Sequence, residues 1–263
     1  MTIAQALSLY EKANPFDSPS ALRDSNYSAY IQNRLTRLLD WREPLPRARL
    51  ADRALRAFLT GGRFPCVAGR AAVASGGYRF GYYGDFADLS STHGIARDLA
   101  AFVAERPSMT GPYATFIAVF DGPRSCDERW FEQSLWCRLQ SLADLDRRYF
   151  RWDPAVSGDP ASPQFAFSFA EEAFFVVGMH PNSSRLGRRF FLPALAFNSH
   201  RQFAEARRTG RFERLQRMIR KNEIALQGSI NPELCEFGER SEARQYSGRP
   251  TETGWRCPFR PHS

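Results

Sequence analysis

The sequence predicts an α+β fold, in which a mainly antiparallel sheet is covered by helices within a single domain spanning residues 1–263. The expected helices and strands do not alternate strictly, as they would in a βαβ protein. The chain contains neither a GxGxxG nor a GxxxxGKS/T phosphate loop. No shift in composition divides the 263 residues, of which 43% are hydrophobic, so one core is expected.

The first 60 residues are predicted to be helical, because apolar residues recur at helical spacing in three segments. Four prolines, at positions 15, 19, 44 and 46, punctuate these segments. The apolar positions are Ile3, Leu7 and Tyr10 in the first segment, Tyr30, Leu35, Leu38 and Leu39 in the second, and Leu50, Leu55, Phe58 and Leu59 in the third.

The pattern of residues changes after Phe64, from helical spacing to short apolar and aromatic runs. Gly76–Gly77 lies between the runs AAVAS and YRFGYY, which predicts a β-hairpin. Leu89–Glu105 is predicted to be a helix that one of its first serines caps. Ala114–Phe120 reads as a buried strand, and Ser125–Arg148 as the clearest helix, because apolar residues recur along it every three or four positions.

The second half begins with a loop rich in Pro, Gly and Asp. The runs QFAFSFA, EEAFFVVGM and LPALAF then predict three strands, of which the first two are adjacent. Helices are expected at about residues 200–208 and 211–226. The tail from Gln227 onward is irregular, yet Phe237, Tyr246, Trp255 and Phe259 predict that it is packed, because aromatic burial offsets the entropy of ordering.

The net charge of +8 raises nucleic acid as a candidate partner. The arginines are scattered, however, and lysine occurs only at Lys12 and Lys221, so we expect no nucleic-acid partner. The N-terminus lacks a basic leader followed by an apolar run, and the longest apolar stretch, Ala173–Met179, is too short to span a membrane. The expectation is a soluble, cytoplasmic protein without a membrane partner.

Five cysteines are present, and neither a disulfide framework nor a structural zinc site is expected from them. Their count is odd and no CxxC pair occurs. Cys66 has a glycine and an arginine just after it, and a nearby arginine lowers the pKa of a thiol. It could present a thiolate to a flat cofactor, and thiolate ligation favours O–O cleavage at haem. The alternative for this residue is a buried structural thiol. The five are Cys66, Cys126, Cys137, Cys235 and Cys257.

Two histidines lie in polar clusters at strand ends. His180 directly follows FFVVGM, and Ser183, Ser184 and Arg185 after it offer donors for an anion such as a carboxylate. His200 lies near the N-terminus of a predicted helix, where the dipole favours the neutral imidazole that ligates metals. A lone histidine is more often structural, but the two clusters together make a functional site about as credible as a structural role.

The tail carries a third polar cluster in the segment SEARQYSGR. Glu242, Arg244 and Arg249 are groups that would suit a cationic amino acid, because a carboxylate faces a guanidinium and an arginine faces an α-carboxylate. The alternative is a loop with surface ion pairs. No GxSxG, HExxH or 2-His-1-carboxylate pattern is present, and His93 and His262 look incidental.

These segments resemble the YqcI/YcgG family. The motifs FPC, GMHPNSSR, FNSHRQF, ALQGSINP, SEARQYSGR and WRCPF occur in the family's order across roughly residues 60–259. Two places depart from the pattern: FAEEAFF lacks a glycine in its turn, and Glu233 stands where methionine is usual. Described members of this family are haem proteins that N-hydroxylate free guanidino amino acids, as in the D-cycloserine and guanitoxin routes.

The resemblance implies a haem b-dependent oxygenase that hydroxylates the guanidino group of L-arginine or a relative, in small-molecule biosynthesis. It implies O2 or hydrogen peroxide as oxidant and leaves open whether an electron donor is also a partner. The alternatives are a haem-binding protein without oxygenase activity and an arginine-rich nucleic-acid-binding module.

The resemblance also suggests roles for individual residues. His180 is expected first as axial ligand, then His200, then Cys66, and the histidine that does not bind iron would line the distal pocket. Arg185, helped by Arg188, would pair with a haem propionate. Glu242 would bind the guanidinium, and Arg244 and Arg249 would bind carboxylates.

Overall fold

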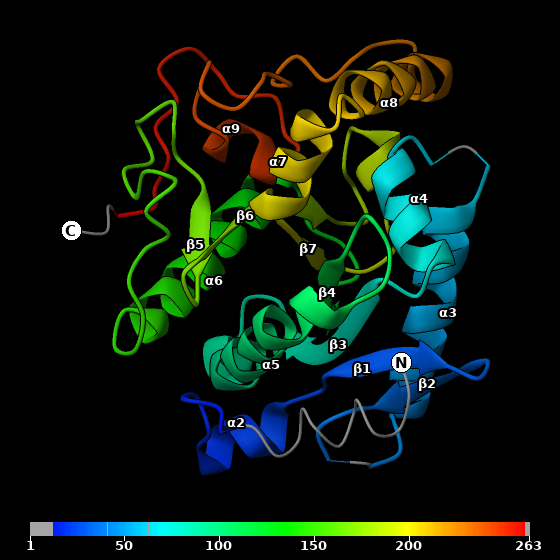
Figure 1. The fold of residues 1–263 in the computed structure, drawn as a ribbon, viewed down its shortest axis with the longest axis vertical. Helices are drawn as coiled ribbons and strands as arrows, with labels where there is room; N and C mark the ends of the chain where they lie inside the picture. The colour runs from blue at the N-terminus through cyan, green and yellow to red at the C-terminus, as the bar shows by residue number, and fades with distance from the viewer. Residues whose placement is uncertain (1–12, 41, 63, 261–263) are drawn as a thin grey trace.

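A seven-stranded sheet lies at the centre of the residues that this computed structural model describes, which are 13–260 without 41 and 63 (Figure 1). The strand order is β2-β1-β3-β4-β7-β6-β5. Only β3 and β4 run parallel, and every other neighbouring pair is antiparallel. The strands are β1 Ser28–Ile31, β2 Arg34–Arg37, β3 Tyr78–Asp85, β4 Thr115–Gly122, β5 Phe167–Phe169, β6 Glu172–Met179 and β7 Ala194–Ser199.

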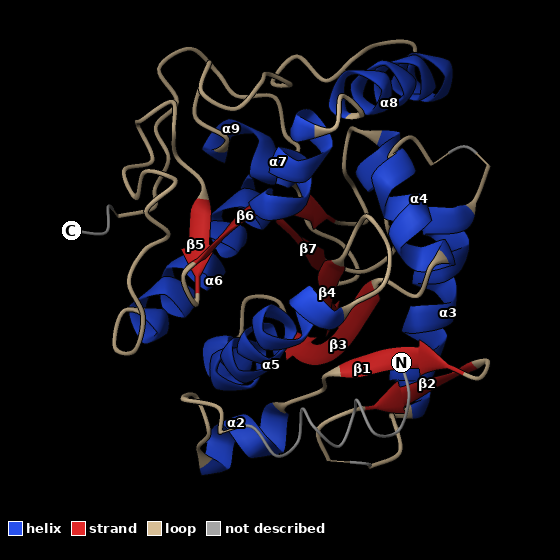
Figure 2. Cartoon of the chain, in the orientation of Figure 1, coloured by secondary structure: helices blue, strands red, loops and turns tan. Residues whose placement is uncertain are grey.

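Helices cover this sheet, so the predicted α+β fold is confirmed (Figure 2). They are α2 Pro19–Asp24, α3 Pro46–Thr60, α4 Val67–Ala74, α5 Thr92–Glu105, α6 Glu128–Asp146, α7 His200–Arg208, α8 Phe212–Gln227 and α9 Ala243–Tyr246. Short 3₁₀ turns occur at Leu89–Ser91, Arg106–Ser108 and Leu186–Arg188. Within the described ranges, no helix is both long and apolar enough to cross a lipid bilayer.

The two faces of the sheet are covered to different extents. Successive strand residues point to opposite faces, so Phe116 and Phe120 of β4 join the larger core cluster with α5 and α6. Ile117 and Val119 point to the other face, where α3 packs in a second cluster. Helices α7 and α8 contribute no residue to either cluster among the described residues. Space is therefore left between these two helices and the second face.

The N-terminal prediction of helices is wrong in the middle segment. Tyr30 and Leu35 pair across a β-hairpin formed by β1 and β2. Its two turn residues, Gln32 and Asn33, have φ values of 48° and 63°, the left-handed conformation of a tight two-residue hairpin turn. Helices do form at α2 and α3, and the predicted helix at residues 3–10 lies outside the described residues.

The predicted hairpin around Gly76–Gly77 is also wrong, because AAVAS belongs to helix α4. Gly76 has a φ of 71° and follows the helix end, a common position for glycine. A Cβ on Gly77 would lie 2.4 Å from the carbonyl oxygen of Tyr113. The two glycines thus join a helix to β3 where the chain passes close to its own backbone.

The remaining predicted elements are confirmed. The adjacent strands β5 and β6 join through Ala170 and Glu171, whose φ values are 51° and 58°. These residues adopt the left-handed conformation without the glycine that this turn favours. In the tail, Tyr246 and Phe259 are buried. The Tyr246 hydroxyl accepts a hydrogen bond from the backbone N–H of Phe167 and donates to the carbonyl of Phe174, so the packed tail holds this hairpin.

Candidate functional site

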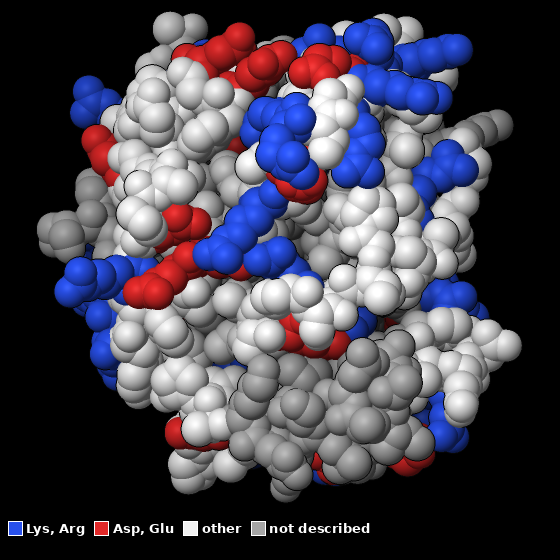
Figure 3. Space-filling model, viewed as in Figure 1, with Lys and Arg blue, Asp and Glu red and all other residues white. Residues whose placement is uncertain are grey.

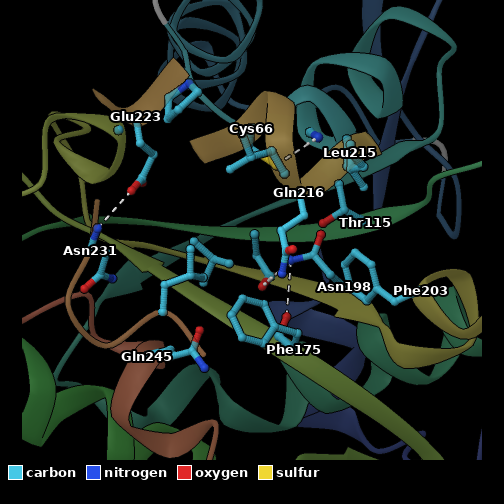
Figure 4. Close-up of a pocket in the computed structure, with 18 of the residues that line it drawn as sticks. Cys66, Thr115, Phe175, Asn198, Phe203, Leu215, Gln216, Glu223, Asn231 and Gln245 are labelled. Atoms are coloured by element: carbon cyan, nitrogen blue, oxygen red, sulfur yellow. Dashed lines mark hydrogen bonds between the residues drawn. The ribbon is translucent and has the colours of Figure 1, made fainter. Parts of the chain in front are cut away.

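A cavity of about 270 Å³ lies over the incompletely covered face of the sheet. Side chains of three neighbouring strands form its floor as two cross-strand rows, Thr115–Asn198–Phe175 and Ile117–Ala196–Val177. Neighbouring strands lie about 4.8 Å apart, so the floor is about 10 Å wide. Figure 4 shows Asn198 and Phe175 side by side on this floor.

Helices α7 and α8 cover the cavity with apolar side chains. Phe203 comes from α7, and Phe212, Leu215 and Ile219 come from one face of α8. The segment after α8 and the start of α9 close another side, with Asn231 and Gln245 among the lining residues. An apolar enclosure lowers the local dielectric constant, which strengthens the interactions of the few polar groups inside.

Cys66 lines the cavity from the N-terminus of α4. Its sulfur caps this helix and accepts a hydrogen bond from the backbone N–H of Gly69 at 3.4 Å (Figure 4). Burial raises the pKa of the thiol, and the N–H groups of Gly69 and Ala68 oppose that rise. Backbone N–H groups and a helix N-terminus stabilise a thiolate. Burial outweighs these N–H groups, so the free thiol keeps its proton and would become a thiolate only on binding a metal.

The FPC loop that carries Cys66 is fixed by contacts from other motifs. The side-chain amide of Asn222 on α8 donates a hydrogen bond to the carbonyl of Pro65 at 3.2 Å. Gly187 leaves room for the Pro65 ring, since a Cβ there would lie 2.7 Å from it. These contacts hold Cys66 in place from two segments more than 100 residues away along the chain.

His200 and Glu242 form a hydrogen-bonded pair in the wall of the cavity. The distance from His200 Nε2 to Glu242 Oε2 is 3.0 Å, and the two side chains are 17% and 7% exposed. His200 follows the N-cap Ser199 of α7, and Glu242 immediately precedes α9. Phe237 contacts the imidazole edge to face. A carboxylate fixes the orientation and tautomer of such a histidine.

The cavity and the residues that line it lie in the part of the chain that matches one protein-family model. The model of the YqcI/YcgG family matches residues 55–260. The chain belongs to the YqcI/YcgG family. Every residue that lines the cavity lies within the matched range. No curated protein and no solved structure matches the chain.

In this YqcI/YcgG-family chain the GMHPNSSR motif lies beside the cavity, and its last two residues hold α8. Arg185 forms a buried ion pair with Glu223 at 2.9 Å, and its guanidinium also donates to the carbonyl of Ser229. Gln227 donates to the carbonyl of Ser184. Arg185 does not line the cavity and its charge is already neutralised, so its expected pairing with a propionate is not supported by its position.

Arg188, by contrast, lines the cavity and has no carboxylate within 4 Å among the residues that the structure describes. Its Nη1 donates to the carbonyl of Tyr246 at 2.9 Å. Burial lowers the pKa of this guanidinium to about 10. A partly buried cation without a counter-ion is costly, so Arg188 is suited to a bound anion.

His180, expected first as the axial ligand, lies on the opposite face of the sheet. The cavity-facing residues of β6 are Phe175, Val177 and Met179, so strand alternation turns His180 toward α6. Its ring stacks on Phe131 with 4.4 Å between centroids, and it is 1% exposed. Burial lowers its pKa to about 4. This placement corrects the expected ranking and leaves His200 and Cys66 as the candidate ligands that line the cavity.

The tail arginines also lie away from the cavity. Arg249 is buried and pairs with Glu132 on α6 at 2.7 Å and with Glu252 at 2.6 Å. Arg244 donates to Thr251 and stacks over Trp255. Arg249 attaches the tail to α6 and Arg244 binds residues within the tail. These placements correct the expectation that both arginines bind carboxylates of a substrate.

Several lining residues were not identified from the sequence. Asn198, Glu223, Asn231 and Gln245 all point their polar groups at or beside the cavity (Figure 4). Asn198 and Gln245 stand inside motifs that the family resemblance already marked, and this was the only signal for them. The described residues contain no group of three or more His, Cys, Asp or Glu side chains positioned to hold a metal ion.

Proposed function

We propose that this chain is a haem b-dependent oxygenase that hydroxylates a guanidino nitrogen of free L-arginine or a related amino acid. The observation that carries the proposal is that Cys66 and the His200–Glu242 pair line one largely apolar cavity. The family membership supports it, because described members include such enzymes.

The donor set of the cavity fits a haem. Cys66 offers a sulfur at the α4 N-terminus that would lose its proton on binding iron. Arg188 offers a cation without a counter-ion, which suits a propionate. The apolar floor and the α8 side chains exclude water from both. We therefore assign Cys66 as axial ligand ahead of His200, and Arg188 in place of Arg185 for the propionate.

The His200–Glu242 pair would handle the guanidinium and its proton. Glu242 Oε2 accepts from or shares a proton with His200 Nε2, and its second carboxylate oxygen has no hydrogen-bond partner among the described residues. A guanidinium can donate to that second oxygen. A nitrogen that is to be hydroxylated must first lose a proton, and that same free carboxylate oxygen can take it while His200 Nε2–H holds the other oxygen.

The other polar lining residues would orient the substrate. The amide groups of Asn198 and Gln245 supply both donors and acceptors in the cavity wall. Arg207 lines the cavity, is exposed and lies over the ring of Phe212 at 4.2 Å. It would pair with the α-carboxylate of the amino acid. A bound haem would supply the activation of O2 or peroxide, which these side chains cannot provide.

The test is an ultraviolet–visible titration of the purified full-length chain with haemin, followed by reduction and addition of CO. Wild type should show a Soret band that shifts strongly to the red with CO, the signature of thiolate ligation. Cys66→Ser should lose that shift, while Cys137→Ser, an exposed thiol on α6, should keep it. His200→Ala should bind haem yet lose the arginine-dependent product, which is one oxygen atom heavier than the substrate.

Three results would contradict the proposal in different ways. If the protein stays colourless after haemin is added, haem is not its cofactor. If Cys66→Ser keeps the thiolate spectrum, the assignment of Cys66 as axial ligand is wrong. A red protein that gives no oxygenated product with any guanidino amino acid would leave a haem-binding protein without oxygenase activity.

A further inference from the structure

We infer that the outer face of α8 is the docking surface for a small acidic electron-transfer protein. The inference rests on the proposed function, because a haem oxygenase that uses O2 needs reducing electrons. It names the partner class and assigns the surface that the partner would occupy.

Helix α8 has two faces with different roles. Phe212, Leu215 and Ile219 line the cavity, as does Glu223 one turn further along. The opposite stripe carries Arg214, Arg217 and Lys221 at helical spacing, and all three are exposed. Exposed apolar side chains lie among them: Met218 is 42% exposed and Ile224 is 50% exposed.

The positive charge of this face is not neutralised by the protein itself. Helix α8 contains four arginines and lysines against two glutamates, and one of these, Glu223, pairs with Arg185. Arg214, Arg217 and Lys221 have no carboxylate within 4 Å among the described residues, whereas Arg79 and Arg106 on other elements are paired with glutamates. Figure 3 shows blue side chains gathered over α7 and α8. An uncompensated basic patch attracts an acidic partner over long range.

The position of the patch relative to the cavity favours an electron donor over other acidic proteins. Helix α8 separates the two, and the diameter of an α-helix with its side chains is about 10 Å. A redox centre at the surface of a docked partner would therefore lie about one helix away from the cavity. No rearrangement of the protein is needed for this approach.

Two other polyanionic partners fit the patch less well. Met218 and Ile224 beside the stripe offer nothing to a nucleic-acid phosphate, but methionine and arginine are enriched in protein interfaces. A helix that binds a membrane surface buries a wide apolar face in lipid. On α8 that face, with Leu215 and Ile219, is turned toward the cavity.

The test measures binding of an oxidised plant-type 2Fe–2S ferredoxin, which is small and acidic, to the full-length chain by calorimetry. The variant R214E/R217E/K221E should bind about tenfold to a hundredfold more weakly than wild type at low ionic strength. The control R34E/R53E/R148E changes the net charge by the same amount on distant exposed residues, and it should bind within about twofold of wild type. Binding by wild type should also weaken steeply with added salt.

Equal affinities for the two triple variants would overturn the inference. So would tighter binding of wild type to phosphatidylserine vesicles or duplex DNA than to ferredoxin. The calorimetric readout needs neither haem nor turnover, so it separates the surface from the proposed function. If the protein stays colourless with haemin but the R214E/R217E/K221E variant binds ferredoxin more weakly than wild type, only the proposed oxygenase activity is refuted. Suppose instead that wild type and both variants show equal peroxide-driven turnover and equal affinity for ferredoxin. That result would refute only the docking surface and would leave the proposed oxygenase standing.

Discussion

Replacing Asp146 by asparagine should stabilise the protein at neutral pH. Asp146 is 3% exposed at the C-terminal end of α6, and its Oδ1 accepts the backbone N–H of Ala170 at 2.9 Å. Burial raises the pKa of this carboxyl to about 7, and the neighbouring charge of Glu171 adds to the rise. An asparagine keeps the acceptor oxygen for Ala170 and removes the buried charge.

The magnitude follows from the linkage between ionisation and folding. A carboxyl with an unfolded pKa of about 3.9 and a folded pKa of about 7 costs about 4 kcal/mol of folding free energy once both states are ionised. Because the folded pKa is the higher one, this cost is absent below about pH 4 and grows as the pH rises toward 7. At pH 5 it amounts to about 1.5 kcal/mol.

Urea unfolding of wild type and Asp146→Asn at pH 5 and pH 8 measures the difference. The gain should be about 4 kcal/mol at pH 8 and about 1.5 kcal/mol at pH 5. Asp144→Asn, a partly exposed carboxylate on the same helix, should change stability by less than about 1 kcal/mol at both values. A gain of equal size at both pH values, or a loss at pH 8, would refute the assignment of a buried ionised carboxyl.

Three further predictions test the packing and the site. Gly178→Ala should destabilise the protein by about 1–3 kcal/mol in urea unfolding, because its Cβ would lie 2.7 Å from the Phe131 ring and 2.9 Å from the Tyr246 carbonyl; a gain in stability would contradict this. Arg249→Ala should cost about 3–5 kcal/mol by stranding the buried Glu132 carboxylate. Adding Glu132→Gln should recover part of that loss, and an unchanged double variant would refute the ion-pair explanation. Glu242→Gln should lower kcat/KM for a guanidino substrate by about 10² or more without altering the haem spectrum; full turnover would remove Glu242 from the site.

Periodicity predicted those elements whose packing repeats along the chain. Helix α6 buries every third or fourth residue, and β4 is apolar from Phe116 to Phe120 because side chains pack on both its faces. The same rule failed for Tyr30 and Leu35, since a strand of four residues is too short to display an alternation. It failed again for AAVAS, because a short run of small apolar residues is compatible with both a helix and a strand.

The candidate site was predicted in part. His200, Glu242, Cys66 and Arg188 were singled out by type and motif, and the structure brings all four to one cavity. His180 had an equally suggestive setting in the sequence, but one position of strand alternation turns it to the other face. Because side chains alternate along a strand, the placement of His180 on the other face could have been predicted once the cavity-facing residues of β6 were known.

By itself the sequence determined the order of most elements and the family, because these depend on local spacing and on motifs along the chain. The tertiary structure alone decided which polar groups meet. His200 contacts Glu242 across 42 positions of sequence, and Arg185 meets Glu223 across 38. Such pairings leave no periodic trace, since they depend on how α8 and the tail pack over the sheet. The same packing pairs Arg185 and Arg249 with glutamates, binds Arg244 within the tail and leaves Arg188 for an anion.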